Sequence, residues 1–483
     1  MARSEKPRNE KNLDLWRRYG KHLIPVMPFL DNVIDHSEGS YLVDVEGNRI
    51  LDLAAGQFCC TLGHNHPAFV KALTDELTRN LHTGSQYVTR SVLLGAQRVT
   101  SIAPHGLSNV LFLSTGSEAN EFAIRIAKAY TGRTGVLGFD RGYYGISLGT
   151  RSLSAISLDH VDFSPQIPDT FHLTTPNALR CPIGKCATGC SLDCLELSIR
   201  QLGSRMERVA AIIVEPIVSA GGMIFPDERY FAAIRKLADD AEALLIVDEA
   251  QTGFGRCGSW FDCENLKLRP DILVFSKTSG NGYPSAGVLI SDRIKDRLLD
   301  RGFYHLSSHQ NDPLTAVAVS SVIDIIEREN LLEQCTNNGR DFLDGLRRIE
   351  QDSPHMWGAR GRGMMLAFEL VSDKDSLSPY IEMLTPFVLA CKARGVHLTY
   401  TYYEGAVRII PPINISREDV DFALSVISDT MRDVAQGKLN VSSHAQENPV
   451  IRDILRRRPV RRIVGRALET SPKQWLRKFK KGF

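Results

Sequence analysis

The chain has 483 residues, of which 43% are hydrophobic and 24% are charged, and its formal net charge is only +2. This composition is typical of a soluble globular enzyme, and no apolar run reaches the roughly 18 residues that a membrane span needs. Because the length exceeds what one core usually supports, we expect two or three domains.

The N-terminal residues and the cysteines indicate in which cellular compartment the protein is expected. Residues 1–11 lack the apolar core of a signal peptide and mix acids with bases, unlike a transit peptide. We therefore expect a cytoplasmic protein whose ten cysteines are mostly free thiols. Four of them, Cys181, Cys186, Cys190 and Cys194, crowd into an insertion at 176–196. Four such thiols could hold zinc, but the paired Cys-x-x-Cys spacing is missing, which favours reduced or locally paired thiols.

In chain order, the first regular structure that the pattern predicts is a β-hairpin of residues 41–45 and 49–53. The loop that follows, residues 54–67, is unusually apolar and glycine-rich. It is either a buried connection or a binding loop that carries Gln57. A helix is predicted from residue 67 to about residue 81.

The next motif is a strand at 110–114, the turn Thr115-Gly116-Ser117 and a helix at 118–130. Such a junction presents backbone N–H groups and the positive end of a helix dipole to an anion, so a phosphate fits there. It is not a Walker loop, because the glycines and the lysine of that pattern are absent. Farther along, the ring of Tyr143 either stacks on a planar ligand or packs in the core.

Two buried apolar runs then end in charged residues, at Asp248 and near Lys277, and Glu215 ends another. Open parallel sheets bind ligands beyond the carboxyl ends of their strands. A lysine that leaves an apolar strand is costly to bury as a cation, so it is deprotonated or bonded. Two interpretations remain: an ordinary charge at a strand end, or a Schiff-base lysine whose acidic partner Asp248 serves the pyridinium nitrogen of pyridoxal phosphate (PLP).

The alternation of strands and helices over roughly 200 residues predicts an α/β fold with a mostly parallel central sheet. Residues 330–436 predict a smaller α+β domain, in which Arg408 is a candidate clamp for a carboxylate. The expected organisation is an N-terminal arm and hairpin at 1–60, a large domain at 61–329, a small domain at 330–437 and a basic tail at 438–483.

Five motifs carry a resemblance to a known family. They are Thr115–Asn120, Glu215-Pro216, Asp248–Arg256, Ser276-Lys277 and Arg408–Pro412. Their order and spacing over residues 40–435 resemble the class III PLP-dependent aminotransferases of fold type I. Within that family the chain is most similar to the 2,2-dialkylglycine decarboxylases. The shared segments there are 55–57, 62–67, 217–222, Ser308-His309 and Asp312-Pro313.

The resemblance implies roles for single residues. Lys277 would bind PLP covalently and shuttle a proton, while Asp248 would pair with the pyridinium nitrogen and keep the ring an electron sink. Gln251 would bond the phenolic oxygen, and Tyr143 would stack on the ring. The implied phosphate ligands are Thr115, Gly116, Ser117 and, from a second subunit, Ser308. The implied ligands of substrate carboxylates are Arg408 and Gln57.

The resemblance also leaves points open. Tyr144 stands where the family usually has histidine, and Ala220 stands where the decarboxylases have a second serine, which puts substrate and decarboxylation in question. The expected activity is decarboxylating transamination of an amino acid, with a 2-oxo acid such as pyruvate as acceptor. The alternatives are a plain aminotransferase acting on an α- or ω-amino group and a non-catalytic scaffold.

The resemblance further implies a homodimer or a dimer of dimers, and nucleic acid is not an expected partner. An alkali cation, K⁺ or Na⁺, is expected among oxygen ligands. The matching positions are Thr83, Ser85, Ser308, Gln310 and Asp312. Outside the resemblance, residues 451–483 hold 12 Lys or Arg against Asp453 and Glu469. This tail is either a solvated appendage or a contact for an acidic surface or membrane.

Overall fold

The computed structural model describes residues 11–24, 29–154, 167–184, 186, 189–401 and 403–439. The prediction for the basic tail falls on residues 451–483 and therefore lies outside the described residues. Among the helices of the described part, none is both long and apolar enough to cross a membrane.

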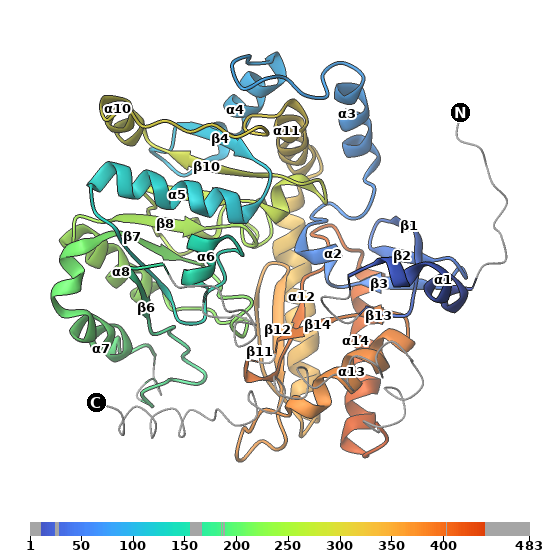
Figure 1. Ribbon diagram of the computed structural model, residues 1–483. Coiled ribbons are helices and arrows are strands. Elements are labelled where there is room, and N and C mark those ends of the chain that lie inside the picture. The colour runs from blue at the N-terminus through green and yellow to red at the C-terminus, as the bar shows by residue number, and fades with distance from the viewer. Residues whose placement is uncertain are drawn as a thin grey trace.

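A seven-stranded sheet forms the centre of the molecule (Figure 1). Its strands in spatial order are β4 (Asn109–Leu113), β10 (Ala286–Ile290), β9 (Ile272–Phe275), β8 (Leu244–Asp248), β7 (Val209–Val214), β5 (Gly135–Phe139) and β6 (Thr170–Leu173). Strand β10 runs antiparallel to both of its neighbours, and the other neighbouring pairs are parallel. The predicted α/β fold with a mostly parallel central sheet is confirmed.

The inner strands are continuous apolar runs because both faces of the sheet are covered. Successive side chains of a strand point to opposite faces, and the core divides accordingly. Ile213 and Ile246 pack with α5 (Gly116–Thr131) on one face. Ile212 and Leu245 belong to the larger cluster on the other face, which includes residues of α8 (Glu228–Asp240).

An antiparallel sheet of β11 (Met356–Arg362), β12 (Met365–Leu370), β15 (Ala406–Ile409) and β14 (Thr399–Thr401) lies beside the central sheet (Figure 1). Its helices are α12 (Leu331–Asp352), α13 (Ile381–Ala393) and α14 (Arg417–Ala435). Residues 396–401 do not form one strand, because the chain changes sheets at Leu398. Residues Val396–His397 form β13 of a third sheet, whereas the residues after Leu398 form β14.

The third sheet pairs an N-terminal segment of the chain with residues 396–397. The predicted hairpin is present as β2 (Tyr41–Asp44) and β3 (Arg49–Asp52), flanked by β1 (Ile34–Glu38) and β13. Strand β13 pairs in parallel with β3. The helix predicted from residue 67 to about 81 is shorter, since α3 spans Pro67–Leu77. Because β3 leads directly into residues 54–60, this sheet fixes where the loop with Gln57 begins.

Candidate active site

Charged and polar residues gather at the carboxyl ends of the central strands. Asp248 is the last residue of β8, Glu215 follows β7, and Lys277 begins a short 3₁₀ turn after β9. The positive charge of Lys277 lies close enough to lower the pKa of both carboxyl groups, against the larger effect of burial. The structure thus brings together the lysine and the acid that the sequence pattern singled out.

Asp248 is held by two donors. Its side chain is buried, with one carboxylate oxygen accepting a 2.7 Å hydrogen bond from Asn120 Nδ2 and the other a 2.9 Å bond from the Ala250 N–H. Burial raises the pKa of Asp248, while these bonds favour the anion. Asn120 also donates to the carbonyl of Tyr144 at 2.9 Å. The sequence alone assigned no role to Asn120. A single amide side chain on the apolar face of α5 is the feature that could have identified it as a functional residue.

Glu215 behaves differently from its neighbour. Burial first, and then the negative charge of Asp248, raise the pKa of Glu215 to about 8. Its Oε1 accepts a 2.8 Å hydrogen bond from the Tyr143 N–H, which positions the loop that carries the Tyr143 ring. The raised pKa favours the protonated form of Glu215, while the bonds from Asn120 and Ala250 favour the anionic form of Asp248.

The predicted anion site lies at the N-terminus of α5. Thr115 caps this helix by accepting a 3.2 Å bond from the Glu118 N–H. The hydroxyl of Ser117 accepts from the N–H groups of Ile146 and Ser147 at 2.9 and 3.1 Å. Gly145 is required here, because it has φ 141° and a Cβ would lie 2.3 Å from Ser117 Oγ. The first N–H groups of the helix have no intrahelical acceptor and remain available to an anion.

Several polar atoms of the site lack a hydrogen-bond partner among the residues that the structure describes. Gln251 Oε1 and Asn120 Oδ1 are buried without a hydrogen bond. Lys277 forms no salt bridge with any described residue. Leaving a buried polar atom unsatisfied costs about 1–3 kcal/mol, so these atoms indicate a polar ligand that is not part of the chain. An anion cradle, a buried carboxylate and a lysine suit the phosphate, ring nitrogen and aldehyde of PLP.

Arg408, on β15, offers a second unsatisfied group. Its Nε is buried and has no partner in the described part of the chain. Nη2 reaches the Tyr400 carbonyl at 3.4 Å, and the guanidinium lies 4.7 Å from the Phe58 ring centroid. Burial lowers the pKa of Arg408 to about 10, so the group remains a cation at neutral pH. A carboxylate would satisfy this charge and the open donors.

Gln57 is exposed on a strained loop. Ala55, Gly56 and Phe58 have φ values of 44°, 68° and 66°, which non-glycine residues seldom adopt. Asp52 supports the loop by accepting from the N–H groups of Ala54 and Gly56 at 3.0 and 2.6 Å. Strain of this kind costs about 1–3 kcal/mol per residue and is concentrated at functional sites.

The same loop is tied to the turn that carries Lys277. The Thr61 hydroxyl donates to the carbonyl of Thr278 at 3.0 Å, and the Leu62 N–H donates to Asn281 Oδ1 at 2.8 Å. The cation of Lys277 also lowers the pKa of the Cys59 thiol, although burial raises it more. These contacts place the loop with Gln57 beside Lys277, which the sequence spacing does not reveal.

The segments expected to hold an alkali cation also lie together. Ser85 Oγ donates to the Ser307 carbonyl at 3.1 Å, and Gln310 Oε1 accepts from the Ser307 N–H at 3.0 Å. The two carboxylate oxygens of Asp312 contact His82 Nδ1 at 2.6 Å and His309 Nδ1 at 2.5 Å. Neither histidine was among the expected ligands. Thr83 is partly buried, and Ser308 is exposed.

Tyr144 and Ala220, the two residues that depart from the family pattern, both form hydrogen bonds within the structure. Tyr144 is buried beneath the site, where its hydroxyl accepts from the Phe139 N–H at 3.0 Å and donates to the Ile213 carbonyl at 3.1 Å. The carbonyl of Ala220 accepts a 2.8 Å bond from Thr401. Tyr144 is thus a structural support of the loop that carries Tyr143.

The fold and this set of residues define an enzyme of the PLP-dependent aminotransferase type. Residues 26–431 match the family described as aminotransferase class-III, and the chain belongs to that family. It is 31% identical, over 86% of this chain and 94% of the relative, to an uncharacterised aminotransferase of Schizosaccharomyces pombe. It is 30% identical to the leucine/methionine racemase of Thermococcus litoralis, over 82% and 89% of the two chains. A transaminase structure from Virgibacillus matches with a TM-score of 0.81 and 25% identity, over 88% of this chain and 100% of that one.

Proposed function

We propose that the protein transfers the amino group of an α-amino acid to a 2-oxo acid and removes the carboxylate of the donor in the first half of the reaction. The observation that carries this proposal is Arg408, a buried cation with an unpaired Nε, beside the strained loop of Gln57. PLP, when bound, supplies an electron sink for the bond that breaks at Cα. The residues of the chain determine whether the bond that breaks joins Cα to the carboxylate or to hydrogen.

Four groups would hold the cofactor. Asp248, whose anionic form is stabilised by the bonds from Asn120 and Ala250, would suit the protonated ring nitrogen. The N-terminus of α5 suits the phosphate. Gln251, whose Oε1 has no hydrogen-bond partner among the described residues, would bond a polar group of the ring. The Tyr143 ring, positioned through the bond of its N–H to Glu215, would stack on the ring face.

Lys277 and Arg408 would have different roles toward the substrate, namely proton transfer and carboxylate binding. Lys277, without a salt bridge to any described residue, can give and accept the proton at Cα. Arg408 would bind a carboxylate through charge-assisted bonds. Gln57 would hold the donor's scissile carboxylate out of the ring plane, where breaking the bond feeds electrons into the ring. In the second half-reaction, the 2-oxo acid would place its own carboxylate on Arg408.

Plain transamination is the second candidate function. Ala220 favours it, because its methyl group offers no polar contact where the resemblance to the decarboxylases would require a serine. The aminotransferase name of the S. pombe relative is also consistent with it. In this case, Lys277 would remove the Cα proton of the donor and Gln57 would have no part in the chemistry.

We further propose that the active enzyme is a dimer. Large apolar side chains are exposed near Ser308, along the segment before α4 (Arg90–Ile102) and in the first turn of α4 itself, more than an isolated chain would be expected to leave in water. They are Leu81, Tyr87, Val88, Leu93, Tyr304 and Leu306. A second subunit covering them would bring Ser308 to the phosphate of its neighbour. Sedimentation at the assay concentration tests this, and an active monomer would refute it.

The alkali cation belongs to the same proposal. Carbonyl and hydroxyl oxygens of residues 83–85 and 307–310 suit K⁺ or Na⁺. A cation there must compete with His82 and His309 for Asp312. Activity that depends on which of the two ions is supplied would support the site.

The experiment that tests the proposed function supplies 2-aminoisobutyrate with pyruvate and measures CO₂ and alanine together. This donor has no Cα proton, so it can react only by losing its carboxylate. Equal amounts of CO₂ and alanine are expected. Alanine formation from ordinary amino donors, with no turnover of 2-aminoisobutyrate, would instead establish plain transamination.

A further inference from the structure

The carboxylate of Asp52, the last residue of β3, is the acceptor for three donors around the loop of Gln57. Its Oδ1 accepts from the Ala54 N–H at 3.0 Å, and its Oδ2 accepts from the Gly56 N–H at 2.6 Å. Oδ2 also lies 3.0 Å from Nε2 of His64. The side chains of Asp52 and His64, which we call the buried pair, are 1% and 9% exposed. The buried pair therefore holds the backbone one residue before Gln57.

His64 supplies the positive charge that the buried carboxylate needs. In the described part of the chain, no lysine or arginine forms a salt bridge with Asp52. Burial works against a charged ring, but the bond to Asp52 opposes it and raises the pKa of His64 to about 10. Without this partner, Asp52 would be a buried charge with no counter-ion, which is relieved by protonation or by movement toward water. Either change weakens the bonds that the carboxylate accepts from the loop.

The backbone of His64 is fixed by contacts of its own. Its N–H donates to the Gly39 carbonyl at 2.7 Å, and the Gly39 N–H donates to the His64 carbonyl at 3.0 Å. Gly63 has φ 83°, and a Cβ there would lie 2.8 Å from the Gly39 oxygen, so this close approach requires a glycine. His64 is thus held against the turn between β1 and β2, and its ring reaches Asp52 from a fixed position.

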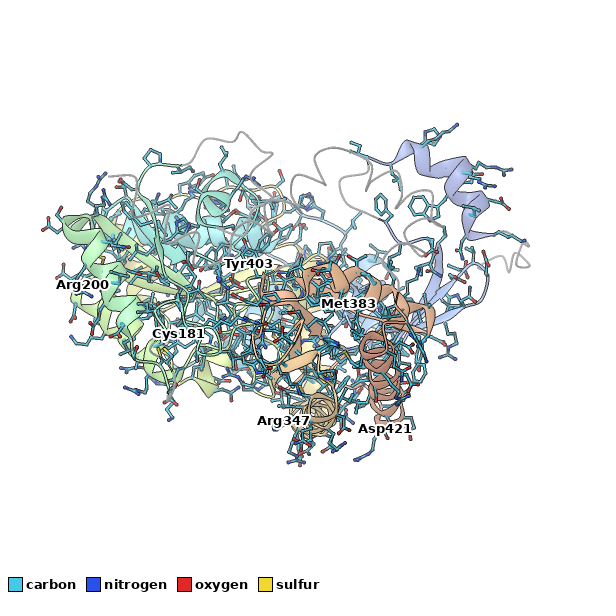
Figure 2. All side chains as sticks on the ribbon, turned by 90° about the horizontal axis from the view of Figure 1, so that it is seen from below. Cys181, Arg200, Arg347, Met383, Tyr403 and Asp421 are labelled. Atoms are coloured by element: carbon cyan, nitrogen blue, oxygen red, sulfur yellow. The ribbon has the colours of Figure 1, made fainter. Side chains whose placement is uncertain are left out.

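The two ends of the Gln57 loop are anchored to the segment that follows β15. The Ile410 N–H donates to the Leu53 carbonyl at 2.7 Å, and the Ile413 N–H donates to the Thr61 carbonyl at 2.9 Å. This segment leads into α14, which packs against α12 and α13. Figure 2 labels one residue on each of these helices, namely Arg347, Met383 and Asp421. The loop therefore has firm ends, and the buried pair supports the strained residues between them.

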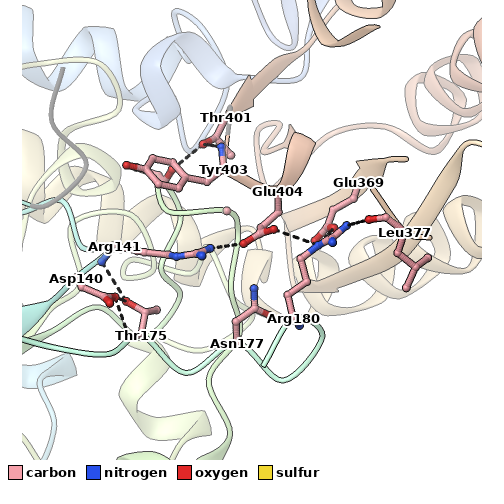
Figure 3. Close-up of polar contacts among 12 residues, drawn as sticks. Asp140, Arg141, Thr175, Asn177, Arg180, Glu369, Leu377, Thr401, Tyr403 and Glu404 are labelled. Carbon is pink, nitrogen blue, oxygen red and sulfur yellow. Dashed lines mark hydrogen bonds and ion pairs between the residues drawn. The ribbon is translucent and has the colours of Figure 1, made fainter. Parts of the chain in front are cut away.

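Arg408 is held on the other side of the site. It lies on β15, which is paired on one side with β12 and on the other with β14. Its Nη2 reaches the Tyr400 carbonyl at 3.4 Å. The chain after Tyr400 is fixed by a separate network, in which Glu404 forms ion pairs with Arg141 and Arg180 (Figure 3). A change in the buried pair should therefore displace the loop and leave Arg408 in place.

We propose that His64 is a positioning residue that acts through Asp52 to hold Gln57 where the donor loses its carboxylate. The inference rests on the proposed function, which gives Gln57 its part in the decarboxylation. With the loop displaced, the carboxylate would no longer be kept out of the ring plane. Removal of the Cα proton by Lys277 would then become the faster reaction, so His64 would help to decide which bond of the donor breaks.

The ratio of two products tests this role. With 2-aminobutyrate as donor and pyruvate as acceptor, breaking the bond to the carboxylate yields CO₂, whereas breaking the bond to hydrogen yields 2-oxobutyrate. His64→Phe should lower the ratio of CO₂ to 2-oxobutyrate by about tenfold or more. Asp52→Asn, which removes the charge and one acceptor, should also lower it. His64→Gln, whose amide can still donate to Asp52, should retain most of the wild-type ratio.

The matched control is His66→Phe, because His66 lies in the same segment but pairs with Glu329 at 3.4 Å. This variant should keep the wild-type ratio. The KM of pyruvate should stay close to that of the wild type in every variant, because Arg408 would bind its carboxylate. A variant that is only partly folded makes less of both products, so the ratio still reports on the position of the loop.

The outcomes separate this inference from the proposed function. An unchanged ratio in His64→Phe and Asp52→Asn, with CO₂ released by the wild type, would overturn the inference and leave the proposed function standing. A loss of both products in equal proportion would also overturn it, since His64 would then only stabilise the fold. Wild-type enzyme that forms 2-oxobutyrate and no CO₂ would overturn the proposed function and, with it, this role of His64.

Discussion

Asn120 donates a 2.7 Å hydrogen bond to Asp248, and the two residues are 128 positions apart in the chain. Asn120 lies on α5, the helix whose N-terminus forms the anion site, while Asp248 ends β8. One helix therefore carries both the proposed phosphate cradle and a donor whose bond favours the anionic form of Asp248.

The first prediction is that Asn120→Ala lowers kcat/KM by roughly 10- to 100-fold. A hydrogen bond to a charged group contributes about 1.5–3 kcal/mol, and its loss leaves Asp248 a weaker anion. Steady-state kinetics measure the loss. The matched control is Asn109→Ala, whose amide bonds the exposed Asp292 at 2.9 Å and which should retain full activity. Equal effects of the two substitutions would mean that Asn120 acts only through stability.

The second prediction is that Lys277→Ala abolishes turnover while the protein still binds PLP. Asp248, the N-terminus of α5 and Tyr143 would remain, but the covalent link and the proton carrier would be gone. The visible absorbance of lysine-bound PLP should disappear, while equilibrium dialysis still detects bound cofactor. Retained catalysis in this variant would refute the assignment of Lys277.

The third prediction concerns Arg408. Replacing it with lysine should raise the KM of the 2-oxo acid by about 100-fold, because a point charge does not reproduce two parallel charge-assisted bonds. Arg432→Lys, on the exposed face of α14, serves as the control. A change in kcat alone, with the KM of the 2-oxo acid unaltered, would show that Arg408 does not bind its carboxylate.

The fourth prediction follows from the raised pKa of Glu215. The stability contributed by this group is fully present below its ordinary pKa of 4.5 and is lost as pH rises through about 8. Glu215→Gln cannot ionise, so its melting temperature relative to the wild type should increase between pH 5 and about pH 8. Each unit of pKa shift corresponds to about 1.4 kcal/mol.

Cofactor-free protein is the right material for this comparison, because a bound ring would change the charge beside Glu215. Glu382→Gln, at an exposed position of α13, is the control and should track the wild type at every pH. A difference between Glu215→Gln and the wild type that stays constant with pH would mean that Glu215 is ionised throughout.

The parts of this molecule that could be predicted from its sequence are the local ones. Buried apolar runs and turn residues predict the central strands and the ends at which Asp248 and Lys277 lie. The bond between Asn120 and Asp248 could not be predicted, because it depends on which face of α5 packs on β8. The same holds for His82 and Asp312, which are 230 positions apart.

Residues 396–401 show a second limit of prediction from sequence. Their sequence has the pattern of one continuous strand, yet Leu398 separates two strands of different sheets. Sheet membership depends on partners far away in the chain, namely β3 for Val396 and β15 for Thr399. The four cysteines of the insertion are a related case, since only the folded chain brings their side chains to one cavity.

The proposed function requires this active site to remove a carboxylate as it takes an amino group. A single-turnover experiment tests it most directly, with PLP-loaded enzyme, 2-aminoisobutyrate and no 2-oxo acid. We predict one CO₂ and one acetone per active site in the wild type, and a much smaller yield over the same time with Gln57→Ala. An enzyme that releases no CO₂ from this donor, yet transaminates alanine at full rate, would contradict the account.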